Sequence, residues 1–146
     1  MKLLDCTIRD GGYYNLWDFE EDLVLDYINQ VNNLPIDLIE IGYRSVEEQE
    51  YFGEYFYLPK SRIKLLSEKC SKKLVLILNE KSTRFEDLDI LVNGLESYIS
   101  LIRIAIDPAN LRRSEKLISA LKNKGFTVAA NIMYLSKWDL EDREFC

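Results

Sequence analysis

The sequence predicts an α/β fold built from parallel βα units, and two patterns support this. Five short apolar runs lie at residues 2–6, 37–42, 74–79, 101–106 and 127–133. Most are rich in Ile, Val and Leu without alternation, which is typical of strands buried on both faces of a parallel sheet. Their first residues are 26 to 37 positions apart, the spacing expected of βα units with right-handed crossovers.

Helical patterns lie between these runs. Residues 19–31, 85–95 and 111–121 each place their apolar side chains on one stripe, and residues 61–70 show a weaker helical pattern. The predicted helix at residues 111–121 is followed by Lys124 and Gly125, a basic last turn with a C-cap glycine. Residues 43–60, aromatic and acidic, form a long connection after the second strand, and long βα loops are usually functional.

Composition limits the class of protein. The chain has 146 residues and a net charge of -6, so we expect one domain, residues 1–146, with no internal boundary and no nucleic-acid or anionic-membrane partner. No apolar run approaches the roughly 20 residues of a membrane span. Three cysteines without metal-like spacing favour a cytoplasmic location. The absence of histidine excludes a self-contained Ser-His-Asp site or a His-ligated zinc within this chain.

Two architectures fit this element order. One is a five-stranded doubly wound open sheet, for which 146 residues is a natural size. The other is the first five units of an eight-stranded TIM barrel, which needs about 250 residues when complete. Residues 136–143 read as the start of a further helix shortly before the sequence stops, which favours the incomplete barrel.

Polar residues gather where the predicted strands end. In both architectures the carboxyl ends of the strands form the site, and these residues are Arg9, Asp10, Tyr13, Glu40, Asn79, Arg103, Asn131 and Tyr134. Each has a simpler structural interpretation. Asp10 before two glycines could shape a turn, Glu40 and Arg103 could form one structural ion pair, and the asparagines could cap helices.

The motif around Asp10 resembles a known family. Residues 4–12, LDCTIRDGG, resemble the D-x-T-L-R-D-G opening of the metal-dependent lyases and aldolases related to 3-hydroxy-3-methylglutaryl-CoA lyase, the DRE-TIM metallolyases. Residues 36–43, IDLIEIGY, are similar to the family segment VDxIEVG. Residues 101–107 and 125–133 resemble strands four and five of the 4-hydroxy-2-oxovalerate aldolase branch. The resemblance spans the chain but only about five of the eight βα units of the family barrel.

The resemblance implies a metal-dependent aldolase or carbon–carbon lyase that acts on a 2-oxo acid or a related carbonyl substrate through a metal-stabilised enolate. Asp10 would be a ligand to Mg²⁺ or Mn²⁺, Arg9 would neutralise the enolate oxygen, and Glu40 would orient Arg9 or a water. The remaining polar residues, Asn79, Arg103, Asn131 and Tyr134, would bind substrate.

Two departures from the family pattern limit this expectation. The His-x-His pair that completes the family's metal site belongs to strand seven, outside this chain. Tyr13 stands where the aldolase branch carries a histidine base. A phenol with a pKa near 10 is a poor base at neutral pH, but it can donate a proton or a hydrogen bond.

Two alternatives stay open from the sequence. A flavodoxin-like small-ligand module would place strand one inside the sheet, in the order 2-1-3-4-5, whereas a barrel segment has the order 1-2-3-4-5. A barrel that lost its chemistry could serve as an interaction domain. For the barrel segment we expect low activity in isolation, and either self-association through its open face and edges or completion by a C-terminal part of the barrel.

Overall fold

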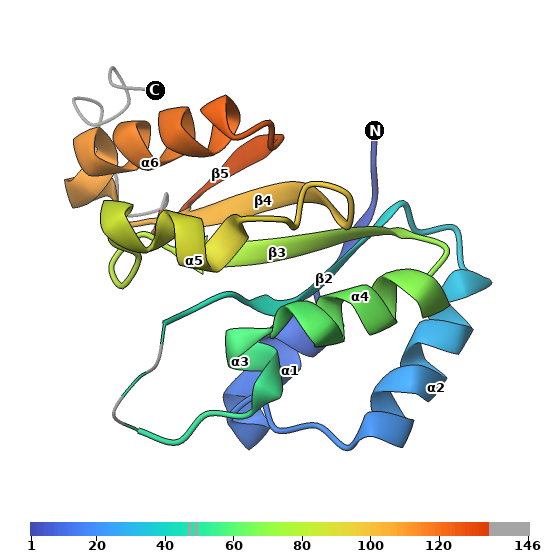
Figure 1. Cartoon of the computed structure of the whole chain (residues 1–146). Coiled ribbons are helices and arrows are strands. Elements are labelled where there is room, and N and C mark those ends of the chain that lie inside the picture. Colours follow the sequence, from blue (N-terminus) through green and yellow to red (C-terminus); the bar gives the residue numbers. More distant parts are fainter. Residues whose placement is uncertain (47, 49, 135–146) are drawn as a thin grey trace.

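The computed structural model describes residues 1–46, 48 and 50–134, and its centre is one parallel sheet (Figure 1). The strands are β1 (Leu4–Asp5), β2 (Leu38–Tyr43), β3 (Lys73–Asn79), β4 (Ile99–Ile106) and β5 (Val128–Ile132). They pair in the order β1-β2-β3-β4-β5, and every pair is parallel. The predicted sequential order is confirmed. Because β1 lies at an edge, the flavodoxin-like alternative is wrong.

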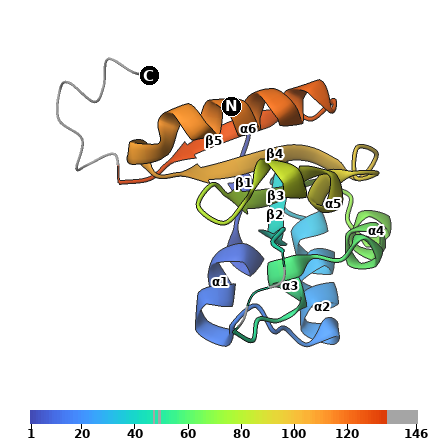
Figure 2. The same cartoon turned by 60° about the vertical axis from the view of Figure 1, so that its left-hand side comes forward.

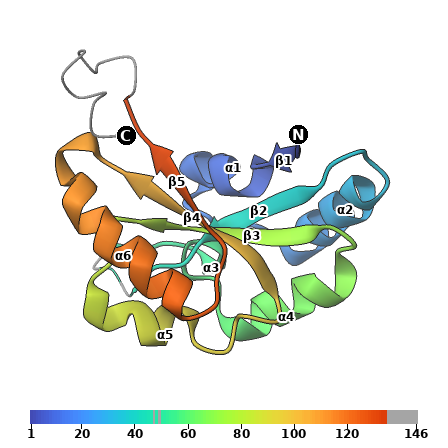
Figure 3. The same ribbon diagram turned by 90° about the horizontal axis from the view of Figure 1, so that it is seen from above.

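The sheet curls into a half-barrel with helices along its outer side. Figure 3 shows α4 (Lys60–Lys69), α5 (Leu88–Val92) and α6 (Leu111–Asn123) on one side of the sheet, with α1 (Thr7–Asn15) across from them between β1 and β5. The remaining elements are α2 (Glu21–Asn32), which packs beside α4, the short helix α3 (Glu54–Tyr57), and the 3-10 turns η1 (Phe85–Asp87) and η2 (Pro108–Asn110). No helix in the described part of the chain is both long and apolar enough to cross a membrane.

Most predicted elements are present, and their burial explains why the apolar runs are continuous. All six residues of β2 are buried, as are the middle five of β3. Ile39 and Leu76 have no exposed surface, and neither do Ile63 and Leu66 of α4. Each such side chain stabilises the fold by about 1.5–3 kcal/mol. The helix predicted at residues 85–95 is shorter than expected: it starts as η1, and α5 ends at Val92, ahead of Gly94 with φ +72°. The helix predicted at residues 136–143 lies outside the described residues.

The largest difference from the sequence prediction is α1. We expected residues 7–13 to continue from the end of strand one, with a turn at Asp10 as one interpretation, but they form the first two turns of a nine-residue helix. Two glycines inside a helix cost about 0.5–1 kcal/mol each, so tertiary contacts must stabilise it. Ile8 is 3% exposed. A Cβ on Gly12 would lie 2.1 Å from the indole of Trp17, so only glycine lets that ring pack on the helix. The interpretation of Asp10 as a turn residue is therefore wrong.

The end of α1 is fixed by the chain before α3. Leu16 and Trp17 both have left-handed backbones, with φ of 56° and 58°, a conformation that is costly for non-glycine residues. The amide of Gly53 donates to the Leu16 carbonyl at 2.7 Å, and the amide of Tyr55 donates to the Trp17 carbonyl at 3.2 Å. These bonds hold α3 beside α1 (Figures 1 and 2).

Candidate functional site

The candidate site lies on the face of the sheet that α1 covers, and strand register explains which side chains reach it. Glu40 pairs with Val75 and Tyr43 pairs with Ile77, so β2 has one extra residue at this point. Val75 and Ile77 are two residues apart and share a face. The bulge therefore places Glu40 and Tyr43 on one face although they are three residues apart. Gly42 occupies the bulge with φ +148°, and a Cβ there would lie 2.2 Å from the carbonyl oxygen of Tyr55.

Two arginines share the buried carboxylate of Glu40. Glu40 has no exposed surface. The Nε of Arg9 donates to its Oε1 at 2.7 Å, and the Nη1 of Arg103 donates to its Oε2 at 2.8 Å. A buried charge is tolerated when it is paired and hydrogen-bonded, and both oxygens of Glu40 are satisfied here. The Glu40–Arg103 pair predicted as a structural alternative is present, but it belongs to a larger arrangement.

The arrangement extends in both directions from Glu40. The Nη2 of Arg103 donates to Oδ1 of Asn131 at 2.7 Å, and the Nη1 of Arg9 forms an ion pair with Asp10. We call these five residues, Asp10, Arg9, Glu40, Arg103 and Asn131, the arginine network. It connects α1, β2, β4 and β5. The sequence predicted all five as site residues, and the structure brings them together; their chemical roles stay predictions.

Helix α1 divides its polar side chains between two directions. Arg9 and Tyr13 are four residues apart and share one helix face. The side chain of Arg9 is 14% exposed, whereas that of Asp10 is 59% exposed. The hydroxyls of Tyr13 and Tyr43 are 2.8 Å apart. Tyr13 is itself 61% exposed, and this hydrogen bond ties its hydroxyl to the end of β2, beside the arginine network.

The electrostatics of the site keep Arg9 charged and keep Tyr43 and Cys6 neutral. Burial alone would lower the pKa of Arg9, but the hydrogen bond and charge of Glu40, together with Asp10, raise it. Burial and the hydrogen bond with Tyr13 raise the pKa of Tyr43. Burial and the charge of Glu40 raise the pKa of Cys6. Cys6 is therefore a neutral thiol near Arg103, and a nucleophilic role does not fit it.

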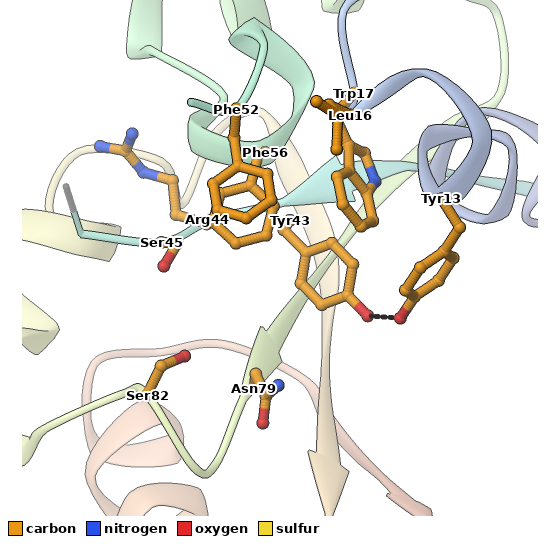
Figure 4. A pocket seen from close by; sticks show the side chains of 10 residues that line it. All are labelled: Tyr13, Leu16, Trp17, Tyr43, Arg44, Ser45, Phe52, Phe56, Asn79 and Ser82. Atoms are coloured by element: carbon orange, nitrogen blue, oxygen red, sulfur yellow. Dashed lines mark hydrogen bonds between the residues drawn. The ribbon is translucent and has the colours of Figure 1, made fainter. Parts of the chain in front are cut away.

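A pocket of about 380 Å³ adjoins the arginine network at the ends of β2 and β3 (Figure 4). It is lined by Tyr13, Leu16, Trp17, Tyr43, Arg44, Ser45, Phe52, Phe56, Asn79 and Ser82. Asn79 belongs to this pocket, and its Oδ1 also accepts from the amide of Lys81 at 3.0 Å, a local turn bond. Tyr134 follows β5, is 52% exposed, and is not part of this lining.

Sequence reasoning missed the aromatic walls of this pocket. The ring of Trp17 lies 4.8–5.9 Å from four other rings, those of Tyr13, Tyr43, Phe52 and Phe56. The aromatic segment 43–60 was predicted to be functional because of its length, which pointed to part of this cluster. Trp17 gave no separate signal, because its position depends on α1 being a helix.

Arg44 is a structural residue despite its place in the lining. Its guanidinium donates to the carbonyls of Tyr57 at 2.7 Å, Leu58 at 3.0 Å, Leu91 at 2.8 Å and Ile90 at 3.3 Å. These carbonyls lie at or near the carboxyl ends of α3 and α5, where a cation is favourable. Figure 4 shows the guanidinium turned away from the aromatic rings.

The described residues do not by themselves form a metal site. Among them, no three His, Cys, Asp or Glu side chains lie close enough to hold an ion. Asp10 is a suitable oxygen donor for a hard cation, but it is one carboxylate and is paired with Arg9. A metal at Asp10 would need further ligands from outside the described chain.

Comparison with known proteins shows a likeness to a solved structure. No family model matches the chain, and no curated protein matches it. Among solved structures, the chain is 48% identical to the N-terminal domain of a putative aldolase from Bacteroides vulgatus, with a TM-score of 0.91. The match covers 94% of this chain but 46% of that one. The chain therefore spans less than half of the structure that it resembles, and the likeness supports an aldolase-like protein in general terms.

Proposed function

We propose that this chain is the N-terminal part of a TIM-barrel enzyme that makes or breaks a carbon–carbon bond beside a carbonyl group. The substrate would be a 2-oxo acid or a related carbonyl compound. The observation that carries the proposal is the arginine network, which extends from Glu40 and Arg103 within β2 and β4 to Asn131 near the end of β5 and to α1, directly after β1. TIM-barrel enzymes place their active sites at the carboxyl ends of the strands. The likeness to an aldolase domain supports it.

Arg9 is suited to stabilise an enolate. Aldol chemistry develops negative charge on the carbonyl oxygen, and a fixed cation lowers that barrier most when it needs no reorganisation. The carboxylate of Glu40 accepts from the Nε of Arg9 on one side and from Arg103 on the other, and Asn131 in turn accepts from Arg103. Glu40 is therefore a positioning residue for Arg9 in this proposal.

Tyr13 would donate a proton or a hydrogen bond to the reacting oxygen. It lies one turn after Arg9 on the same face of α1, and Tyr43 fixes its hydroxyl. A base for proton abstraction is not assigned within the described residues. Tyr43, whose pKa is raised by burial, stays neutral and serves as the anchor of Tyr13.

A divalent metal, Mg²⁺ or Mn²⁺, is part of the proposal for the full-length protein only. Asp10 would be its ligand from this chain, and the other ligands would lie outside it. Such an ion would polarise the substrate carbonyl as a Lewis acid. The cytoplasmic location, self-association and the substrate-binding roles of Asn79, Arg103, Asn131 and Tyr134 stay predictions.

The test is enolate formation rather than full turnover. Full-length protein is incubated with pyruvate in D₂O with Mg²⁺ or Mn²⁺, and exchange of the methyl protons is followed by NMR. We expect exchange in the wild type and a loss of at least about 100-fold in Arg9→Gln, the effect of removing one oxyanion donor. Glu68→Gln on the exposed face of α4 is the control. If the protein catalyses no exchange with any 2-oxo acid tried, the non-catalytic barrel is favoured instead.

A further inference from the structure

The pocket beside the arginine network has two chemically different walls. Figure 4 shows the rings of Trp17, Tyr43, Phe52 and Phe56 gathered on one side, with Asn79 and Ser82 facing them from the other. Phe52 and Phe56 stack at 4.2 Å with their planes 18° apart. The aromatic wall is built from segments far apart in sequence, so the fold maintains it as a packed surface.

The described lining of the pocket offers no free charge to a ligand. Among these residues Arg44 alone is charged, and its guanidinium is occupied by four backbone carbonyls. The other polar groups are neutral hydroxyls and an amide. The hydroxyl of Ser45 is buried and has no hydrogen-bond partner among the described residues. A charged group placed here would lose hydration and would meet hydrogen-bonding groups but no opposite charge of the described lining, which is costly.

The pocket is large enough for a ring. A cavity of about 150 Å³ is sufficient to hold benzene, and this pocket measures about 380 Å³. Its border with the arginine network is the Tyr13–Tyr43 hydroxyl pair, and the charges of Arg9 and Glu40 act on Tyr43. A molecule that spans this border would have its reacting end near Arg9 and its other end against the aromatic wall.

We propose that the substrate carries an uncharged apolar group of about the size of a phenyl ring, and that this group binds in the aromatic pocket. This rests on the proposed function for the orientation of the reacting end. The pocket itself is independent of that chemistry. Stacking against Phe52 and Phe56 selects the ring, and the absence of a usable charge in the lining disfavours substrates with a second charged end.

The first experiment tests the pocket without catalysis. Benzyl alcohol is titrated into ¹⁵N-labelled full-length protein, and the indole N–H of Trp17 is followed by NMR, with its resonance assigned by its loss in Trp17→Phe. This N–H donates to the Arg9 carbonyl at 2.9 Å beside the pocket. We expect a saturable shift of this resonance. The affinity for benzyl alcohol should fall about 3- to 10-fold in Phe52→Ala because aromatic contact is lost. The shift should be absent in Ser82→Phe, because the larger side chain fills the pocket.

The matched control is Phe85→Ala, because Phe85 is 60% exposed and lies outside this lining. It should leave the shift unchanged. Absence of a saturable shift in the wild type, or an equal effect of Phe85→Ala and Phe52→Ala, would overturn the pocket proposal whatever the protein catalyses.

The second experiment links the pocket to the reaction. Calorimetry compares 2-oxo-4-phenylbutyrate with 2-oxobutyrate, which differ by the phenyl ring. We expect at least 10-fold tighter binding of the phenyl compound. Ser82→Phe should remove this preference, whereas Phe85→Ala should leave the binding of both acids unchanged. If benzyl alcohol binds but the phenyl acid has no advantage, the pocket does not receive the substrate tail and the proposal fails. If neither acid binds while benzyl alcohol does, the 2-oxo acid assignment fails and the ring-binding pocket stands.

Discussion

Replacing Glu40 by glutamine tests whether the arginine network depends on one buried charge. Glutamine keeps the shape and one acceptor oxygen, but its amide group presents N–H donors to the second arginine. Arg9 or Arg103 would then lose its partner in a site where Glu40 has no exposed surface. Breaking a buried ion pair costs about 3–5 kcal/mol. Because the two arginines are 14% and 16% exposed and can reach some water, we expect the lower end, about 3 kcal/mol.

The assay is urea unfolding of the full-length protein followed by far-UV circular dichroism, with thermal unfolding as a second measurement. For a domain of 150–250 residues, about 3 kcal/mol corresponds to a decrease in Tm of roughly 6–12 °C. Glu68→Gln, on the exposed side of α4, is the control and should change the free energy of unfolding by less than about 0.5 kcal/mol.

A triple variant separates the charge from the packing. Glu40→Leu combined with Arg9→Leu and Arg103→Met replaces the ion cluster by apolar side chains, which is often neutral or stabilising. We expect it to recover most of the stability lost in Glu40→Gln while losing all proton exchange with pyruvate. If Glu40→Gln is as stable as Glu68→Gln, the carboxylate does not hold the two arginines, and its role as a positioning residue is refuted.

Four further predictions concern single groups. Gly12→Ala should lose about 1–3 kcal/mol of stability in urea unfolding, because its methyl group would lie 2.1 Å from the indole of Trp17. Gly11→Ala is the control and should lose nothing, because the nearest atom to its methyl group would be 3.5 Å away. Equal losses in the two variants would contradict the packing of α1. Tyr55→Phe should preserve the Tm or raise it, since the buried hydroxyl has no hydrogen-bond partner among the described residues, and a loss above about 1 kcal/mol would contradict this. Burial raises the pKa of Tyr55 to about 12, so the unfolded chain releases this proton first. The stability from this group, complete below pH 10, should fall as the pH rises from 10 to 12, as measured by unfolding with phenolate absorbance. Tyr55→Phe should make the decrease smaller, and the remainder comes from Tyr27 and Tyr43, whose pKa values are also raised. Asp10→Asn should change the free energy of unfolding by less than about 1 kcal/mol, because the side chain is 59% exposed, yet abolish proton exchange in the full-length protein; retained exchange would remove Asp10 from the reaction.

Most of the sheet could be predicted from the sequence because parallel strands buried on both faces leave a continuous apolar signal. The charges inside those runs, Glu40 and Arg103, pointed to the site for the same reason: a charge in an apolar strand needs a partner. The helix α1 could not be predicted, because Gly11 and Gly12 oppose helix formation locally and the stabilising contact comes from Trp17, outside the helix. The aromatic pocket was missed with it, since its walls meet only when α1 and α3 are in place.

Because the motif around Asp10 lies in the helix α1, one short segment places its side chains in two different environments. As a turn, residues 9–13 could have presented Arg9, Asp10 and Tyr13 in any direction. In α1, Arg9 and Tyr13 share the face toward β2, where Glu40 and Tyr43 hold them, and Asp10 is rotated by about 100° to the exposed side. The groups that would meet the substrate's oxygen are therefore fixed by this chain alone, while the carboxylate proposed for the metal stays accessible to ligands from elsewhere. This division predicts that changes at Glu40 act on stability and on Arg9 together, whereas changes at Asp10 act on activity with little effect on the fold.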